Sequence, residues 1–273
     1  MSAGPDTTAR LAPGQAPAPI ESAWLDGVLW LSIHRPERRN SLSLGCLDAL
    51  RDALLACDAR SDLKLVVLRG SGDKAFAAGG DLQEFDALRS ARDAEAIFDR
   101  AAAALDALRE CPVPVIAALN GVALGGGAEL ALSCDYRVAA PHARIGFVQA
   151  SLGITTGFGG GAAVLRRLGR AGAMRLLAEA RLYSAEEALQ QGLVDRVCAP
   201  GQSLEDCVMD FAAPFLERAP HLVRAIKALL GGAAPDAGQR EQERAAFAAT
   251  WEHPLHWQLL AAMQQARMSK EKP

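Results

Sequence analysis

Aromatic residues are scarce in this chain, and this scarcity limits how its core can be packed. Phe, Trp and Tyr make up 5% of the 273 residues, although 50% of the residues are hydrophobic. Ala, Leu and Val must therefore supply most of the packing. The length is sufficient for one full-sized domain, or for one domain with an appendage.

A strong charge of either sign is also lacking. The net charge is −3 at pH 7, and the basic clusters Arg38-Arg39, Arg166-Arg167 and Lys270-Glu271-Lys272 are brief. This balance offers no electrostatic attraction to nucleic acid or to an anionic membrane. No apolar run reaches the roughly 18–20 residues that a membrane helix needs. We therefore expect neither nucleic acid nor a membrane as a partner.

Cysteine pairs and an export signal are missing as well. Six cysteines are scattered along the chain without a C-x-x-C pair. Residues 1–20 contain one Arg, many Pro and Ala and no apolar core, which predicts a flexible N-terminal arm rather than a signal peptide. These features predict a cytoplasmic protein with free and mostly buried thiols.

Motifs for metals and nucleotides are weak. Residues 157–162 spell G-x-G-x-x-A, but no convincing strand precedes them, and Glu179, the acid about twenty residues on, falls inside a helical pattern. His253 and His256 are separated by Pro254 and have no nearby acid or Cys partner. We therefore expect no metal site and no dinucleotide cofactor.

What the sequence does contain is an alternation of short apolar runs and helical patterns. Strands are expected at 27–33, 63–68, 134–139, 144–147 and 194–197, and helices at about 43–59, 90–110, 162–168, 171–179 and 184–191. From Ser203 onward only helical patterns occur, with breaks at Pro220, 231–232 and Pro254. This order predicts an α/β core over residues 21–200 and a helical C-terminal region over residues 201–273.

Two strand–glycine–helix joints stand out, at 74–82 (K-A-F-A-A-G-G-D-L) and 114–130 (P-V-I-A-A-L-N-G-V-A-L-G-G-G-A-E-L). Such a turn exposes backbone N–H groups at the positive end of a helix. Gly80 and Gly126 are each expected to donate one N–H to the same oxygen, and a side chain there would block the approach of a ligand. Two such donors next to a carboxylate, here Glu129, are the components of an enolate-forming site. By itself, the second joint also fits a buried packing joint whose acid merely favours the helix start.

These two segments, together with Cys134-Asp135 and the S-A-E-E-A-L-Q-Q-G-L-V run at 184–194, resemble the crotonase (enoyl-CoA hydratase/isomerase) superfamily over about residues 22–230. The resemblance implies an α/β fold, the crotonase spiral of repeated ββα turns around two sheets. It implies a C-terminal helical region that forms homotrimers, which often pair into hexamers. It also implies an acyl-CoA thioester substrate and no metal or redox cofactor.

The resemblance assigns roles to individual residues. The N–H groups of Gly80 and Gly126 match the family's oxyanion hole, and Glu129 matches an acid/base. Substrate and CoA contacts fall on a further set of residues: Ala78, Asp81, Leu82 and Gln83. Family hydratases often carry Lys where this chain has Gln83, so one phosphate contact is expected to be missing.

Position 149 departs from the family pattern. Family hydratases use two glutamates, and the position of the second is occupied here by Gln149. Glutamine cannot give or take a proton at neutral pH, and losing one general acid/base typically costs ~10²–10⁴ in rate. The ending F-A-A-T-W-E-H-P at 247–254 resembles the ethylmalonyl-CoA decarboxylase branch.

Three interpretations follow from this departure. The preferred one is a hydratase or isomerase that works with Glu129. The second is a decarboxylase of a malonyl-type acyl-CoA, such as ethylmalonyl- or methylmalonyl-CoA. The third is a homologue that binds acyl-CoA without catalysis, against which the carboxylate of Glu129 argues.

Overall fold

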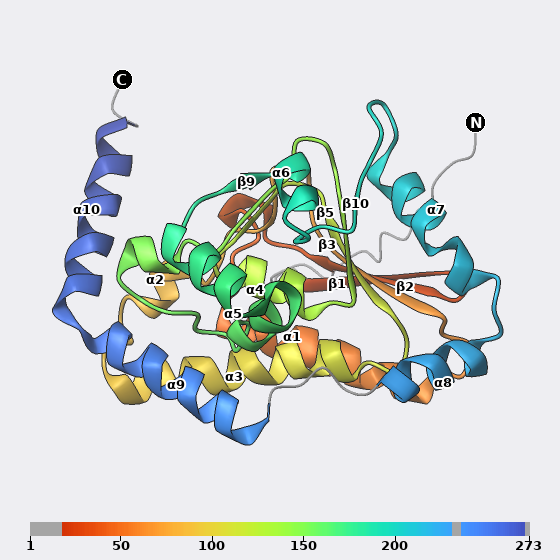
Figure 1. The fold of residues 1–273 in the computed structure, drawn as a ribbon, viewed down its shortest axis with the longest axis horizontal. Coiled ribbons are helices and arrows are strands. Elements are labelled where there is room, and N and C mark those ends of the chain that lie inside the picture. Colours follow the sequence, from red (N-terminus) through yellow and green to blue (C-terminus); the bar gives the residue numbers. More distant parts are fainter. Residues whose placement is uncertain (1–17, 231–235, 271–273) are drawn as a thin grey trace, which may run out of the picture.

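Two β-sheets form the centre of the molecule in the computed structural model, which describes residues 18–230 and 236–270 (Figure 1). The six-stranded sheet has the order β1 (Ile20–Leu25), β2 (Val28–Ile33), β3 (Leu65–Gly70), β5 (Val115–Leu119), β7 (Tyr136–Ala139), β10 (Arg196–Val197). The four-stranded sheet has the order β4 (Ala75–Ala77), β6 (Val122–Leu124), β8 (Arg144–Gly146), β9 (Tyr183–Ser184).

Each turn of the chain gives one strand to each sheet. β3, β5 and β7 pair in parallel in the large sheet, and β4, β6 and β8, which directly follow them in sequence, pair in parallel in the small one. The helices of these turns are α2 (Leu82–Phe85), α3 (Ala91–Glu110), α4 (Gly126–Ser133) and α5 (Gly161–Glu179). This stacking is the predicted spiral of strand–strand–helix turns.

The central strands are apolar on both faces because helices cover both faces of the large sheet. Val66 and Leu68 of β3 belong to the main core, which also contains buried residues of α1 (Leu44–Leu55) and α3. Leu65 and Val67 point the other way and pack with residues of α7 (Leu204–Leu216). Parallel strands that are covered on both sides read as continuous hydrophobic runs.

The C-terminal helices are α7, α8 (Pro220–Leu230), α9 (Ala237–Glu252) and α10 (Pro254–Lys270). α9 lies along α3 (Figure 1), where Arg244 pairs with Glu95 at 2.9 Å and with Asp99 at 3.0 Å. α10 runs along one edge of the molecule. In the described part of the chain, no helix is both long and apolar enough to cross a membrane.

Most expected elements are present, with a few differences. β1, β6 and β9 were not predicted, and β1 begins at Ile20, so the predicted boundary of the arm falls inside a strand. Residues 1–17 of that arm lie outside the described residues. The two helices predicted at 162–168 and 171–179 form α5, which is kinked at Gly169, where φ is 65°. α6 (Ala185–Gln190) follows its predicted cap, and all six cysteines are free and buried as predicted.

Candidate active site

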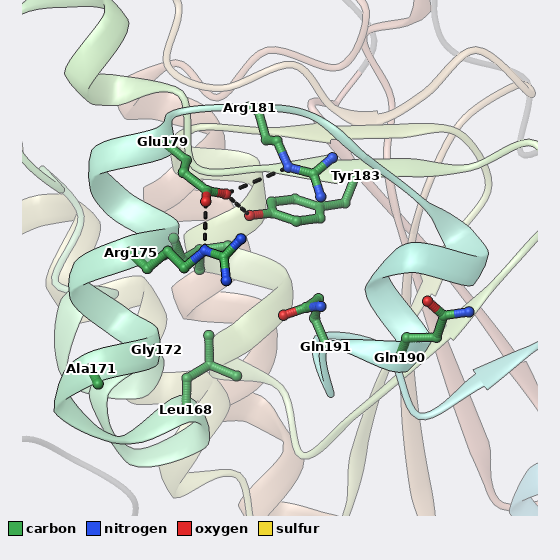
Figure 2. A pocket seen from close by; sticks show the side chains of 10 residues that line it. Leu168, Ala171, Gly172, Arg175, Glu179, Arg181, Tyr183, Gln190 and Gln191 are labelled. Atoms are coloured by element: carbon green, nitrogen blue, oxygen red, sulfur yellow. Dashed lines mark hydrogen bonds and ion pairs between the residues drawn. The ribbon is translucent and has the colours of Figure 1, made fainter.

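Two hollows on the surface contain none of the predicted site residues. One of about 440 Å³ is lined by residues of α5 and of the 181–191 segment, where Glu179 accepts hydrogen bonds from Arg175 and from the Tyr183 hydroxyl (Figure 2). A second, of about 240 Å³, is lined by arginines that include Arg109 and Arg137. We therefore locate the candidate site by its backbone N–H donors and titratable side chains, which lie outside these two hollows.

The two glycine joints lie against each other because β4 and β6 are neighbours in the small sheet. A Cβ on Gly127 would lie 2.1 Å from the carbonyl oxygen of Ala77, and a Cβ on Gly79 would lie 3.0 Å from that of Leu124. Gly79 and Gly125 also have positive φ angles, of 94° and 54°. Only glycine permits so close an approach of the two backbones. This approach brings the two separately predicted segments together into one site.

Gly80 and Gly126, the two predicted donors, lie beside the same aromatic ring. A Cβ on Gly126 would lie 2.5 Å from the Phe158 ring, and one on Gly80 would lie 3.5 Å from it. Gly126 is the first residue of α4, so its N–H has no acceptor within the helix. Gly80 forms a bridge with Leu42 in which the residues on either side of Gly80 make the hydrogen bonds. An added side chain would first meet Phe158 at Gly126 and Phe85 at Gly80, whereas the sequence had indicated open space for a ligand.

Glu129 lies in the first turn of α4 and is 1% exposed. Its Oε1 accepts hydrogen bonds from Nε2 of Gln149 at 2.7 Å and from the N–H of Gly157 at 3.2 Å. Its Oε2 accepts from the N–H groups of Phe158 at 3.0 Å and Gly160 at 2.9 Å. The glycine-rich loop, residues 153–160, therefore closes around this carboxylate with its backbone donors pointing inward.

Burial raises the pKa of Glu129 to about 7, and the negative charge of Glu243 acts in the same direction. The three backbone N–H donors oppose this shift but do not cancel it. Glu243, on α9, accepts hydrogen bonds from the Thr156 hydroxyl at 2.6 Å and from the N–H of Gly161 at 2.8 Å. Two carboxylates thus hold the same loop. Glu129 can exist in both protonation states near neutral pH, as a proton carrier must.

Gln149 is buried at the start of the short 3₁₀ helix η3 (Gln149–Leu152). Its Nε2 donates to Glu129, while its buried Oε1 has no hydrogen-bond partner among the described residues. The two positions that the family resemblance paired are therefore in direct contact. Rotation of the amide would present Oε1 to a protonated Glu129, so Gln149 is able to bond either protonation state.

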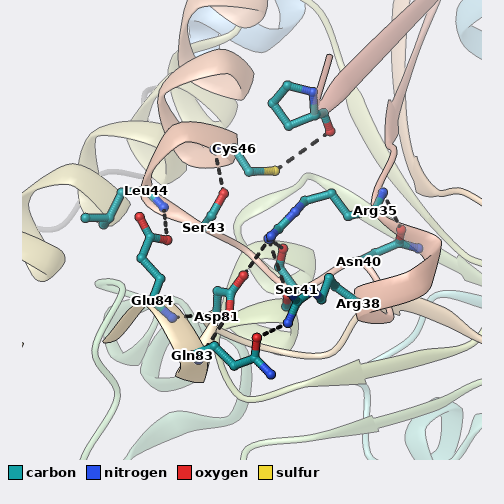
Figure 3. A network of polar contacts seen from close by, with 11 residues as sticks. Arg35, Arg38, Asn40, Ser41, Ser43, Leu44, Cys46, Asp81, Gln83 and Glu84 are labelled. Carbon is teal, nitrogen blue, oxygen red and sulfur yellow. Dashed lines mark hydrogen bonds and ion pairs between the residues drawn. The ribbon is translucent and has the colours of Figure 1, made fainter. Parts of the chain in front are cut away.

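Asp81, the acid of the first joint, is held by a different set of contacts. It caps α2 by accepting from the N–H groups of Gln83 at 3.2 Å and Glu84 at 3.5 Å, and Arg35 donates to its Oδ2 at 2.7 Å (Figure 3). Burial by itself raises the pKa of Asp81, but Arg35 and the two amides outweigh it and hold the pKa below its usual value. Asp81 therefore remains ionised and structural.

The rest of the predicted CoA-binding segment lies at the surface beside an arginine-bearing loop. The N–H of Ala78 donates to the Arg39 carbonyl at 3.1 Å, and Leu82 is half-buried at the start of α2. The exposed side chain of Gln83 accepts a hydrogen bond from Arg38. The structure thus brings the guanidinium of Arg38 next to Gln83, the position where family hydratases often carry a lysine.

A spiral of strand–strand–helix turns whose glycine joints meet beside one buried carboxylate defines the crotonase class of proteins. The model of the enoyl-CoA hydratase/isomerase family matches residues 25–258. The chain belongs to this family, as the sequence resemblance predicted.

Individual relatives agree with this assignment. The crotonyl-CoA hydratase of Syntrophomonas wolfei is 39% identical over 201 residues, which cover 72% of this chain and 75% of the relative. The short-chain-enoyl-CoA hydratase of Clostridium acetobutylicum is 35% identical over 199 residues, with the same two coverages of 72% and 75%.

Solved structures share the fold. The enoyl-CoA hydratase from Bacillus anthracis superposes with a TM-score of 0.74 at 32% identity, over 91% of this chain and 96% of that one. The one from Bacillus halodurans reaches 0.82 at 24% identity, over 89% and 99%. The chain is an acyl-CoA enzyme of the enoyl-CoA hydratase/isomerase type.

Proposed function

We propose that this protein is an enoyl-CoA hydratase or isomerase that stabilises a thioester enolate between the N–H groups of Gly80 and Gly126 and moves the proton with Glu129. The observation that carries the proposal is the buried Glu129 carboxylate, with a pKa of about 7, in the loop that also packs on both glycines. The names of two relatives, a crotonyl-CoA hydratase and a short-chain-enoyl-CoA hydratase, support it.

In this mechanism the thioester oxygen lies between the two N–H groups and gains negative charge as the enolate forms. Removing one such donor typically costs about 3–4 kcal/mol of transition-state stabilisation. A double-bond shift needs one proton carrier, because the proton taken from one carbon is returned to another. Hydration adds hydroxyl to the β-carbon and a proton to the α-carbon, and Glu129 relays the proton from water. The chemistry uses no metal or redox cofactor.

Gln149 supplies no proton in this scheme but keeps the carboxyl group in place. It donates through Nε2 while Glu129 is ionised and accepts through Oε1 after the proton has been taken up. The same two side chains thus remain bonded throughout the cycle.

Decarboxylation of a malonyl-type acyl-CoA is the second candidate. Loss of CO₂ leaves the same thioester enolate, which needs the same two donors and then one proton on the α-carbon. The observation that favours it is the neutral amide of Gln149 next to Glu129, where a second carboxylate would repel a substrate carboxylate.

A homotrimer or hexamer is also part of the proposal. α8 exposes four apolar side chains at helical spacing, namely Leu222, Ile226, Leu229 and Leu230. Such a stripe on a surface helix is normally buried against another element, and a second copy of the chain would cover it. Light scattering after size-exclusion chromatography measures the assembly directly, and a monomer would contradict this part of the proposal.

The activity is tested by supplying crotonyl-CoA, ethylmalonyl-CoA and methylmalonyl-CoA in parallel and identifying the products by mass spectrometry. We expect 3-hydroxybutyryl-CoA or a shifted double bond. Release of CO₂ without turnover of crotonyl-CoA would establish the second candidate. Tight CoA binding without any turnover would identify a non-catalytic homologue.

The role of position 149 is tested by Gln149→Glu, which restores the second carboxylate of the family. Hydration of crotonyl-CoA should then rise by about tenfold or more. Gln149→Ala is the matched control and should show no such rise. An unchanged rate in the Glu variant would mean that the pocket is built for another reaction.

A further inference from the structure

Phe158 lies beside each of the three groups of the proposed reaction centre. Its ring lies 2.5 Å from the position of a Cβ on Gly126 and 3.5 Å from that of a Cβ on Gly80. Its backbone N–H donates to Oε2 of Glu129 at 3.0 Å. The residue is 5% exposed. One side chain therefore borders both oxyanion glycines while its own backbone holds the proton carrier.

The backbone that carries this ring is fixed on both sides. The neighbouring N–H groups of Gly157 and Gly160 also donate to Glu129. A Cβ on Gly157 would lie 2.5 Å from the ring of Phe247, so the loop is pressed against α9 as well. Displacing the Phe158 ring would disturb the hydrogen bonds of the carboxylate itself.

Three further aromatic residues lie near this point. The Phe85 ring lies 2.5 Å from the position of a Cβ on Gly80 and packs edge-on against Trp251, with ring centroids 6.3 Å apart. Trp251 also packs against Phe247 at 5.3 Å and donates its indole N–H to the Leu88 carbonyl at 2.7 Å. Rings from α2 and the glycine-rich loop thus border the two glycine joints, and rings of α9 pack behind them.

We propose that Phe158 is the wall that limits the acyl group of the substrate to a short chain, a step that rests on the proposed function. A thioester whose oxygen lies between Gly80 and Gly126, and whose α-carbon faces Glu129, must run its acyl carbons along this ring. A flat, short enoyl group packs on a ring face. Further methylenes need space that the ring fills, and a close-packed interior does not yield such space freely.

The test measures binding rather than turnover, so that it does not depend on the reaction. Dissociation constants of butyryl-CoA, octanoyl-CoA and free CoA are determined by titration calorimetry on the full chain. Wild type should bind butyryl-CoA at least about tenfold more tightly than octanoyl-CoA. In Phe158→Ala the affinity for octanoyl-CoA should rise about tenfold or more, since each newly buried methylene contributes up to about fourfold. The affinity for free CoA should not change.

Two further variants keep the test decisive. Phe158→Leu keeps an apolar side chain in the loop and should give an intermediate ratio if Phe158→Ala fails to fold. Phe211→Ala is the matched control. Phe211 lies on α7 and packs on Tyr136 with ring centroids 5.3 Å apart, on the other side of the large sheet, so its removal should leave the ratio unchanged.

The outcomes separate this inference from the function on which it rests. Equal binding of both chain lengths by wild type, or an unchanged ratio in both Phe158 variants, overturns the role of Phe158 alone. Failure of wild type to bind any acyl-CoA overturns the proposed function and the inference together.

Discussion

The two glycine joints have the same design but give opposite properties to the acids that follow them. Asp81 and Glu129 are both buried, with exposures of 7% and 1%. Asp81 has the guanidinium of Arg35 at 2.7 Å. Among the described residues, the hydrogen-bond donors around Glu129 are all neutral amides, and the negative charge of Glu243 raises its pKa further.

The difference shows what decides the state of a buried carboxylate. Burial disfavours the charged form in both places, and at Asp81 the cation of Arg35, together with two backbone amides, outweighs it. The pKa of Asp81 therefore lies below its usual value, whereas that of Glu129 is raised to about 7. Asp81, in the first joint, is a permanent structural ion. Glu129, in the second joint, gains and loses a proton near neutral pH.

The largest effect on turnover is expected from Glu129→Gln, which removes the titratable group of the second joint. This change keeps the shape of the side chain but removes its acid/base function. Turnover should fall by about 10³-fold or more, measured as steady-state kcat with whichever of the three acyl-CoA thioesters the wild type turns over. Binding of free CoA should be retained.

The matched control is Asp81→Asn, the same chemical change at the first joint. It removes a structural ion, so its main effect should be a lower free energy of unfolding, with a smaller effect on kcat. If Glu129→Gln retained a tenth of the wild-type rate, Glu129 would not be the proton carrier.

The two acids should also give opposite dependences of stability on pH. The folded pKa of Glu129 is raised from 4.5 to about 7, so the folded protein holds a proton that the unfolded chain releases between those values. The free energy of unfolding should therefore fall by about 3 kcal/mol as the pH rises from about 4.5 to about 7, and then level off. Urea unfolding at a series of pH values measures this fall, which should vanish in Glu129→Gln.

The contribution of Asp81 has the reverse sign. Because its folded pKa is lowered, its stabilisation is present above the ordinary pKa of an aspartate and is lost as the pH falls through the folded value. Asp81→Asn should remove this acid-side loss and leave the fall below pH 7 intact. If the free energy of unfolding of Glu129→Gln still fell between pH 5 and pH 7, Glu129 would not be the cause of that fall.

Removing the cation of the first joint should make Asp81 resemble Glu129. In Arg35→Ala a buried carboxylate loses its ion pair, and the Ser41 carbonyl loses a donor at 2.6 Å. We expect about 2 kcal/mol of destabilisation in urea unfolding at pH 7. Arg38→Ala is the matched control, since that exposed side chain contacts the neutral Gln83, and it should change stability by less than about 0.5 kcal/mol. Equal effects of the two variants would show that the Asp81 pair is not a structural ion.

Both joints could be found from the sequence because each is a local pattern, a short apolar run followed by glycines and an acid. The spiral itself followed from the alternation of strands and helices and from the family resemblance. β1 was missed because its burial pattern shows no clean alternation, and its position depends on pairing with β2. β6 was missed because three residues, Val122 to Leu124, are too few to show a period.

The surroundings of Glu129 could not be predicted in the same way. Glu243 reaches the loop only because α9 packs along α3, and no motif marks it in the sequence. Phe158 did carry a signal, since a bulky apolar residue among four glycines of a loop must find a partner. Its contacts with Gly80 and Gly126 depend on the folding of that loop over α4.

The smallest effect is expected when the pKa of Glu129 is changed by a substitution at another residue. Glu243→Gln removes the negative charge that helps to raise the pKa of Glu129, while the amide oxygen is still able to accept from Thr156 and Gly161. The pKa of Glu129 should move down, so the limb of the pH–rate profile that reports it should shift to lower pH. The maximal rate should stay within about threefold of wild type. Glu241→Gln, on the exposed side of the same helix, is the matched control and should leave the profile in place. If the profiles of both variants coincided with wild type, burial and the loop amides alone would set the pKa of Glu129.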